Sequence, residues 1–259
     1  MRVPSITQGI HGQFHDSSRD CACQTMSYER ILETRGEVNI AFSKFLSDAK
    51  RQLGLHDAFA GPLKDLEAAE KKADREYGGN KELVTDYVRG KGIVRTPEEI
   101  IKIKEALLDK YSELMEKHGV LLVQMTDFFE DPKDFTGYSA LNIKLAVPVG
   151  KEGEYQVVEW QVVADQIEAV YDITHPYKAA AEAIHDRAAE EGRELTKEER
   201  REAAYNFAAC RLYNGQARRD AGYDILLKPE LVGKHALTRN REIKLKGMVD
   251  NLEVMHRDR

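Results

Sequence analysis

Three apolar segments in the middle of the chain limit the folds that it can adopt. Residues 120–123 read Val-Leu-Leu-Val, and residues 138–147 and 155–163 are rich in alternating or continuous apolar side chains, as β-strands are. Helical patterns lie before and after them, and residues 83–94 suggest a further strand after a helical or turning start. Because the order does not repeat β-α-β units, we expect an α+β fold with a mixed sheet of about four to five strands flanked by helices.

The helical segments carry recognisable start and stop signals. Ser27 is an N-cap candidate for a first helix, and Pro62 would occupy the first turn of a second helix that carries Lys64 and Lys72. Residues 96–99, Thr-Pro-Glu-Glu, form the start signal of a third helix. The Ala-, Glu- and Arg-rich residues 179–219 predict two more helices, separated near Gly192.

These patterns divide the chain of 259 residues into three parts. We expect an N-terminal arm and helix over residues 1–55, an α+β core over residues 56–185, and a C-terminal helical extension over residues 186–259. The first and last parts would be helical additions to the core.

The charge and hydropathy of the chain exclude several classes of protein. The net charge is −6, from 39 basic and 45 acidic residues, so there is no overall basic surface for nucleic acid. No apolar run reaches the ~18 residues of a membrane-spanning helix, and the N-terminus lacks the apolar stretch of a signal peptide. We therefore expect a soluble protein without membrane contacts, located in the cytoplasm or delivered into another cell.

The cysteines do not form a disulfide framework. Cys21, Cys23 and Cys210 are an odd number, which fits a reducing compartment. His11, His15, Cys21 and Cys23 could supply two nitrogen and two sulfur ligands to zinc, but Cys-x-Cys is not the usual spacing of a zinc knuckle. A polar arm over residues 1–26 is the favoured interpretation.

One polar pair stands out within an apolar strand. Glu159 and Gln161 lie two residues apart, so they share one face of the predicted strand 155–163, whose other residues are almost all apolar. Removing a carboxylate from water costs several kcal/mol unless it is paired or bound to a metal. This position therefore favours a functional glutamate over a structural one.

Two earlier segments carry charges that phosphate chemistry requires. Lys64 and Lys72 are eight residues apart, slightly over two helical turns, so both ammonium groups would lie near one helix face. Asp86 and Arg89 follow, an acid and a base three residues apart. Taken singly, exposed lysines and a surface ion pair explain these residues equally well.

Two later segments carry groups that could bind a nucleotide. Tyr138 and Asn142 are four residues apart on what should be one strand face, and an aromatic ring can stack on a base. His175 lies where the helical region begins, in the sequence His-Pro-Tyr-Lys. A buried core tyrosine and a capping histidine are the simpler interpretations of these residues taken alone.

The order of these elements resembles the RelA/SpoT nucleotidyltransferase family. A lysine helix, Asp-x-x-Arg, a Gly-Tyr strand, Glu-x-Gln and His-x-Tyr-Lys follow one another between residues 61 and 185. The resemblance implies a nucleotidyltransferase-like fold and transfer of pyrophosphate from ATP to the ribose 3′-oxygen of GDP or GTP. It also implies that Asp86 and Glu159 hold Mg²⁺, and that Glu159 takes the proton from the attacking hydroxyl.

The resemblance further implies which side chains bind each substrate. Those that would neutralise the donor triphosphate are Lys64, Lys72 and Arg89. Those that would bind the acceptor are Tyr138, by stacking on its base, and Asn142, Gln161 and His175.

Departures from the family pattern keep two other functions open. Pro62 and Ala68 stand where the family usually has an arginine and a serine or similar residue, so the chain could be a degenerate nucleotide- or partner-binding domain. The basic residues between 235 and 246 could contact phosphates of tRNA, which would then be the acceptor. The motifs look most like the small or toxin-associated branch of the family, which implies an antitoxin or immunity protein as a possible partner.

Overall fold

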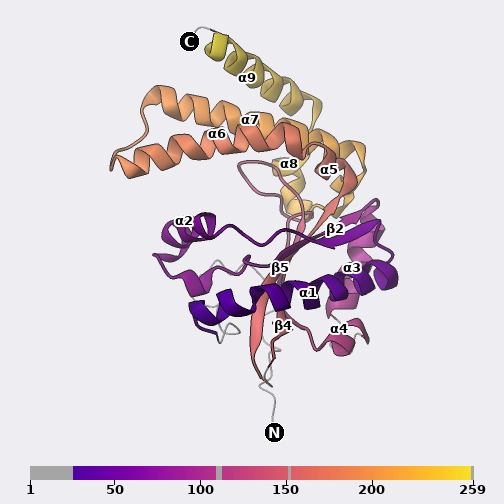
Figure 1. Ribbon diagram of the computed structural model, residues 1–259. Coiled ribbons are helices and arrows are strands. Elements are labelled where there is room, and N and C mark those ends of the chain that lie inside the picture. Colours follow the sequence, from indigo (N-terminus) through magenta and orange to yellow (C-terminus); the bar gives the residue numbers. More distant parts are fainter. Residues whose placement is uncertain (1–25, 109–112, 151–152, 258–259) are drawn as a thin grey trace.

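A long helix, α1 (Tyr28–Leu53), covers one face of a β-sheet (Figure 1). The structure is a computed structural model that describes residues 26–108, 113–150 and 153–257. Ser27 caps α1 as expected, since its side chain accepts a hydrogen bond from Arg30 N, and Gly54 ends the helix with a φ of 72°. The predicted arm and the candidate zinc ligands within it lie outside the described residues.

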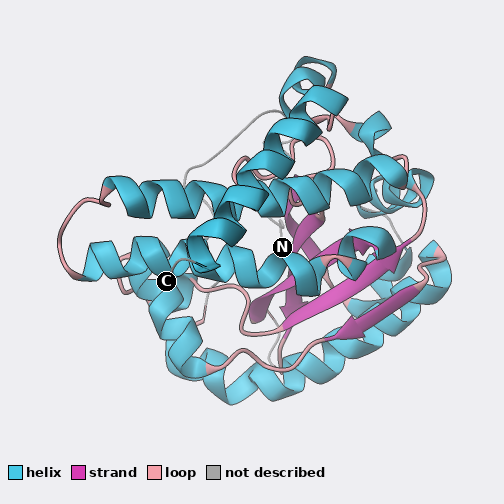
Figure 2. Cartoon of the chain, turned by 90° about the horizontal axis from the view of Figure 1, so that it is seen from above, coloured by secondary structure: helices cyan, strands magenta, loops and turns pink. Residues whose placement is uncertain are grey.

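The described strands form one five-stranded mixed sheet in the order β1-β2-β5-β4-β3. They are β1 (Asp57–Ala60), β2 (Arg89–Val94), β3 (Leu121–Asp127), β4 (Leu141–Pro148) and β5 (Tyr155–Ala164). β2 and β5 are parallel, and the other neighbouring strands are antiparallel. Helices lie on both sides of the sheet (Figure 2), so the predicted α+β class is confirmed.

The two faces of the central strand β5 differ in polarity. Trp160 faces α1 and is fully buried, with its ring 5.9 Å from that of Phe45 and at 90° to it. Val158 and Val162 belong to the same apolar core. Because side chains alternate along a strand, Glu159 and Gln161 point to the opposite face, where they are partly exposed. The sequence-based assignment of these residues to one face is confirmed.

The start of the lysine helix was predicted too early. α2 (Leu66–Tyr77) begins after Asp65, whose side chain accepts a hydrogen bond from Ala68 N. Lys64 therefore lies before the helix, and its backbone N–H donates to Tyr87 O at 3.1 Å. The extended backbone of residues 61–64 runs beside the segment that leads into β2, because this pairing satisfies its hydrogen bonds better than a helical turn would.

The turning start expected before β2 is present, whereas the strand predicted over residues 138–147 is shorter than expected at its N-terminal end. A short 3₁₀ helix, η1 (Lys81–Leu83), and a loop containing Asp86 precede β2. Tyr138 lies in the loop before β4, where a turn closes with Gly137 N donating to Lys133 O at 2.7 Å. Gly137 has a φ of 66°, which stops an extended strand at this point. The expectation that Tyr138 and Asn142 share a strand face is therefore wrong.

The remaining helices follow the sequence signals. After β2 come α3 (Pro97–Leu108) and α4 (Glu113–His118), and after β5 come α5 (Asp165–Ala169), α6 (Tyr171–Glu190) and α7 (Lys197–Asp220). Gly192 lies in the connection between α6 and α7, as predicted. The chain continues through η2 (Tyr223–Leu226), η3 (Pro229–Leu231), α8 (Val232–His235) and α9 (Arg239–Arg257).

The C-terminal helices have a second, smaller core of their own. Ala209 and Leu212 of α7 pack against Leu245 and Val249 of α9, with Leu237 beside them. By contrast, the buried residues of α1 belong to the same core as the sheet. Among the described residues, none of the helices is both long and apolar enough to cross a membrane. The predicted boundaries near residues 55 and 185 stay predictions.

Candidate active site

A buried carboxylate between two lysines marks one end of the polar sheet face. Asp86 is only 7% exposed, and its Oδ2 lies 2.8 Å from Lys64 Nζ and 3.1 Å from Lys72 Nζ. Burial alone would raise the pKa of the Asp86 carboxyl, but the Lys72 and Lys64 ammonium groups outweigh it and hold the pKa below its usual value. The carboxylate is therefore ionised. Lys64 approaches it from the segment before α2, and Lys72 approaches it from α2 itself.

Glu159 lies next to this group. Burial would lower the pKa of Lys72, but the negative charges of Asp86 and then Glu159 outweigh it and raise the pKa. Glu159 Oε1 accepts a hydrogen bond from Gln161 Nε2 at 2.9 Å, which fixes the orientation of both side chains. The two carboxylates thus act on the same ammonium group, Asp86 from the loop before β2 and Glu159 from β5.

The strands beside β5 place more polar residues on the same face. The Cα of Arg89 in β2 is paired with that of Glu159, and the Cα of Asn142 in β4 is paired with that of Gln161. Arg89 is exposed and forms no ion pair with any described residue. Asn142 Oδ1 is buried without a hydrogen-bond partner. Arg89 and Asn142 therefore offer a free cation and a free acceptor toward this face.

Aromatic rings and a histidine lie at the other end of the face. Tyr138 packs against Ile93, Ala140 and Val163, and burial, followed by the charge of Glu168, raises the pKa of its phenol well above the usual value. His175 lies on the exposed side of α6, with its ring 5.1 Å from that of Tyr171. The structure thus brings the predicted residues to one side of the sheet, and their roles stay predictions.

Three lysines at this site were missed by sequence reasoning. Lys91 has its Cα paired with that of Gln161, and its Nζ lies 2.6 Å from Glu168 Oε1 and 5.3 Å from the centre of the Tyr171 ring. The Cα of Lys144 in β4 is paired with that of Glu159. The alternation Arg-Gly-Lys-Gly at residues 89–92 could have indicated Lys91, since it places the cations on one face and the glycines on the other.

The third missed lysine, Lys133, comes from the loop before β4. Its side chain is solvent-accessible, yet surrounding protein atoms, and then the Lys178 cation, lower its pKa. Glu159 acts in the opposite direction and raises it. No local pattern marks Lys133, because only the turn at Gly137 directs this loop toward the site.

The carboxylates at the site suit a hard divalent cation. Asp86 Oδ1 is buried and has no hydrogen-bond partner, so one carboxylate oxygen remains for a ligand while Oδ2 is held by the lysines. Mg²⁺ prefers oxygen ligands and commonly binds one or two carboxylates together with substrate phosphates. Asp86 and Glu159 therefore fit a magnesium ion that a nucleotide brings with it.

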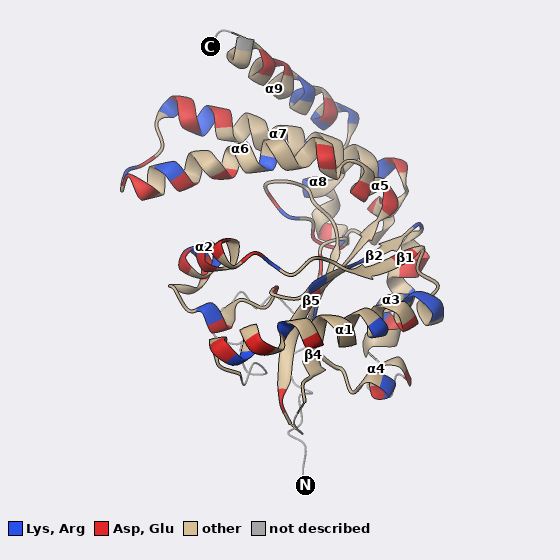
Figure 3. Cartoon of the chain, in the orientation of Figure 1, with Lys and Arg blue, Asp and Glu red and all other residues tan. Residues whose placement is uncertain are grey.

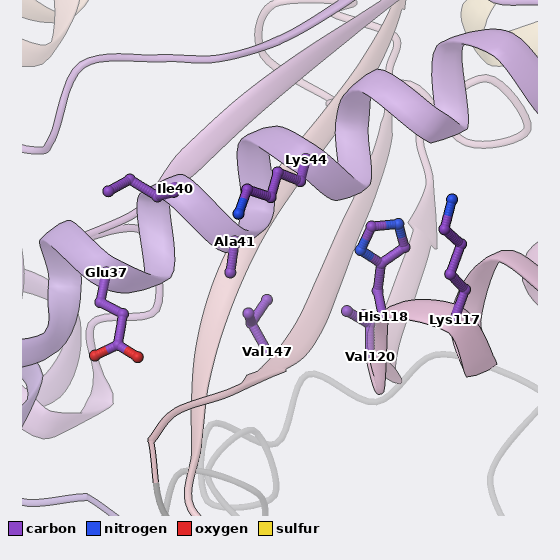
Figure 4. A pocket seen from close by; sticks show the side chains of 8 residues that line it. All are labelled: Glu37, Ile40, Ala41, Lys44, Lys117, His118, Val120 and Val147. Atoms are coloured by element: carbon purple, nitrogen blue, oxygen red, sulfur yellow. The ribbon is translucent and has the colours of Figure 1, made fainter.

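Two partly open pockets in the described part of the chain lie elsewhere. A cavity of about 380 Å³ lies between α1 and the end of α4, lined by Lys44, His118 and Val147 among others (Figure 4). Another, of about 680 Å³, lies between α7 and α9 and includes Arg211 and Met248. Neither is lined by any of the predicted site residues.

The fold and the site define an α+β domain with an apolar sheet face under α1 and a charged face opposite it. Acidic and basic residues are interspersed along α6, α7 and α9 (Figure 3), so these helices do not form a surface of one charge. The chain matches no model of a known protein family and no curated protein. Solved structures do share its general arrangement of helices and strands.

Three of these structures illustrate the likeness. Small alarmone synthetase 1 from Bacillus subtilis, bound to its product pppGpp, is 16% identical, with a TM-score of 0.49 over 75% of this chain and 97% of that chain. Small alarmone synthetase 2 from the same organism is 16% identical, with a TM-score of 0.47 over 75% and 95%. The Type VI effector Tas1, in complex with its immunity protein, is 16% identical, with a TM-score of 0.40 over 75% and 100%.

Proposed function

We propose that this protein transfers pyrophosphate from ATP to the 3′-hydroxyl of a purine nucleotide in a magnesium-dependent reaction. The observation that carries the proposal is the position of Asp86, ionised between Lys64 and Lys72 and beside Glu159. Phosphoryl transfer depends mostly on positioning and on neutralisation of phosphate charge, and this group supplies cations and carboxylates within one small region.

The side chains at this end of the face would bind the donor. Lys64 and Lys72 are at present shared by one carboxylate, and a triphosphate would offer them further negative oxygens. Arg89, exposed and without an ion pair among the described residues, would add a third cation. Mg²⁺, held by Asp86 and Glu159, would neutralise charge on the phosphates.

Glu159 would act as the general base. Its carboxylate would accept the proton of the acceptor 3′-hydroxyl as the 3′-oxygen bonds to the β-phosphorus of ATP. The bond between the β-phosphorus and the oxygen that bridges it to the α-phosphate would break, and AMP would leave with that oxygen. Gln161, which donates to Glu159 Oε1, would hold the carboxylate in place during this step.

The opposite end of the face would bind the acceptor. Tyr138 would offer its ring to the purine base, and Asn142 and Gln161, whose Cα atoms are paired across β4 and β5, would provide hydrogen bonds. His175 would contribute through the surface that it forms with Tyr171. This division places the donor and the acceptor on either side of Glu159.

A direct test is to incubate the purified protein with γ-labelled ATP, Mg²⁺ and GDP, GTP, ADP or bulk tRNA in separate reactions. The proposal predicts labelled pyrophosphate on one nucleotide, release of AMP, and no product when a chelator removes Mg²⁺. Label on tRNA alone would show that the acceptor is RNA and not a free nucleotide. Nucleotide binding without transfer to any acceptor would identify a degenerate binding domain instead.

Two of the basic residues between 235 and 246 have partners within the protein. Arg241 donates to the backbone oxygens of Ala236 and Gly233, and Lys246 pairs with Glu242. Arg239 and Lys244 of α9 are exposed and form no ion pair with a described residue, so tRNA stays the alternative acceptor. A protein partner such as an immunity protein remains part of the proposal, since the motifs resemble toxin-associated relatives.

A further inference from the structure

A second group of potential metal ligands lies apart from Asp86 and Glu159. Asp131 and Asp134 come from the loop between β3 and β4, and His235 comes from the end of α8. His235 Nε2 lies 3.3 Å from Asp131 Oδ1 and 3.7 Å from Asp134 Oδ1. Among the described residues, this is the one group of three such side chains close enough to share an ion.

The Nε2 atom of the histidine in this group makes no hydrogen bond. The His235 side chain is only 3% exposed, and its Nε2 is buried without a hydrogen bond, even though two carboxylates are near. Buried polar atoms are rarely left unpaired, because each costs about 1–3 kcal/mol. An atom that points at two carboxylates without bonding to either suggests that something else binds between them.

The spacing fits a small divalent ion. Tetrahedral ligands at the ~2.0–2.2 Å bond lengths of zinc are separated from one another by about 3.3–3.6 Å. The two separations from His235 Nε2, 3.3 and 3.7 Å, lie close to this range, and the three ligand atoms all lie within 4.8 Å of one another. A nitrogen ligand with two carboxylates favours zinc or a similar transition metal over Mg²⁺.

We propose that Asp131, Asp134 and His235 bind one divalent transition-metal ion of the zinc type, with water at its remaining position. Lys234 now competes for this site, because its Nζ lies 2.5 Å from Asp134 Oδ1. The side chains of Lys234 and Asp134 are 46% and 55% exposed, so the ammonium can turn into solvent when the ion binds. Lys234 thereby lowers the affinity of the site for metal.

The ion would tie the loop before β4 to the C-terminal helices. The same loop carries Lys133 and Tyr138, and it already contacts α7, since Asn214 Nδ2 donates to Thr136 O at 3.1 Å. A metal bridge to His235 would restrict the loop further and so hold Tyr138 in place. This consequence rests on the proposed function, whereas metal binding itself does not.

The test uses the full chain, freed of metal with a chelator and titrated with Zn²⁺ or Co²⁺ by calorimetry and visible absorption. We expect one ion per chain, with affinity at least tenfold weaker in Asp134→Asn and roughly three- to tenfold tighter in Lys234→Met. Asp74→Asn, an exposed carboxylate on α2, should leave binding unchanged. Zn²⁺ should also raise the unfolding temperature of the wild type more than that of Asp134→Asn.

Two results would overturn the proposal. One is the absence of stoichiometric binding by the wild type and by Lys234→Met. The other is binding that Asp134→Asn leaves intact but that replacement of Cys21 and Cys23 by serine removes. Asp134 is exposed, so its substitution does not threaten the fold, and repeating the titration in Glu159→Gln separates the result from any activity.

Discussion

The ammonium group of Lys72 lies 3.1 Å from the Asp86 carboxylate, a contact that joins α2 to the loop before β2. Lys64 reaches the same oxygen at 2.8 Å from outside the helix. Lys72 also lies 4.0 Å from Glu76 and within reach of the charge of Glu159, so several carboxylates share the two cations.

Removing the negative charge of Asp86 should cost both stability and activity. In Asp86→Asn the two ammonium groups keep their proximity but lose their shared counterion, so we expect destabilisation of about 1–3 kcal/mol and at least a hundredfold loss of transfer. Urea unfolding and the labelled-ATP assay measure the two effects. Asp74→Asn, on the exposed side of α2, is the control, and an equal effect of both substitutions would contradict the account.

Substitutions of the two neighbouring lysines of α2 should change the affinity for ATP to different extents. Lys72 contacts Asp86, whereas Lys71 pairs with Glu67 on the surface, where ion pairs contribute little. Lys72→Met should weaken ATP binding at least tenfold, and Lys71→Met should change it less than twofold. Calorimetric titration with a non-hydrolysable ATP analogue gives both values. Similar affinities in the two variants would remove Lys72 from the donor site.

The contribution of Asp86 to the free energy of unfolding should fall as the pH is lowered. Its folded-state pKa lies below the unfolded value of about 3.9, so its contribution is complete above about pH 5 and is lost as the pH falls through the folded pKa. The difference in unfolding free energy between the wild type and Asp86→Asn should therefore be constant from about pH 6 to 8 and shrink below about pH 4. A difference that grows on acidification would show that the pKa is raised instead.

Gly90 should tolerate no side chain. A Cβ at this position would lie 2.5 Å from Leu46 Cδ1, 2.8 Å from Phe42 Cε1 and 3.0 Å from the backbone oxygen of Phe59. Gly90→Ala should destabilise the protein by about 1–3 kcal/mol, because α1 and β1 would have to move. Gly247→Ala, in the open space of α9, should be neutral or stabilising by up to about 1 kcal/mol. Thermal unfolding of the two variants provides the comparison.

The thiol of Cys210 should react slowly. Burial raises its pKa to about 11, so the reactive thiolate is on the order of a thousandth of the population at pH 8. Alkylation by iodoacetamide, followed at the Cys210 peptide by mass spectrometry, should be far slower in the native protein than in urea. Equal rates would show that α7 opens readily at this residue.

The fold could be predicted from local patterns because apolar periodicity reports burial directly. The apolar strand residues 155–163 and the capping signal at Ser27 each appear where they were expected. β1 could not be predicted, since its four residues become a strand only by pairing with β2. The start of α2 was misplaced for a similar reason, because Lys64 is drawn into a backbone contact with Tyr87, which is distant in sequence.

The candidate site was predictable only in part. Glu159 was singled out because a charge within an apolar strand requires a reason, and its role stays a prediction; the pairing of Lys64 and Lys72 with Asp86 was not predicted. Lys133 could not be identified, because it approaches Glu159 through the fold of a loop and not through any spacing along the chain. Side chains brought together by distant segments leave no local pattern.

The central claim is that Glu159 removes the proton from the acceptor hydroxyl. The most direct measurement is single-turnover transfer of label from ATP by Glu159→Gln, with nucleotide binding measured in the same variant and with Glu67→Gln, an exposed carboxylate, as control. If Glu159 is the general base, Glu159→Gln should bind ATP and the acceptor but transfer label at least a thousandfold more slowly, while the control should match the wild type. Transfer by Glu159→Gln at the wild-type rate would contradict it.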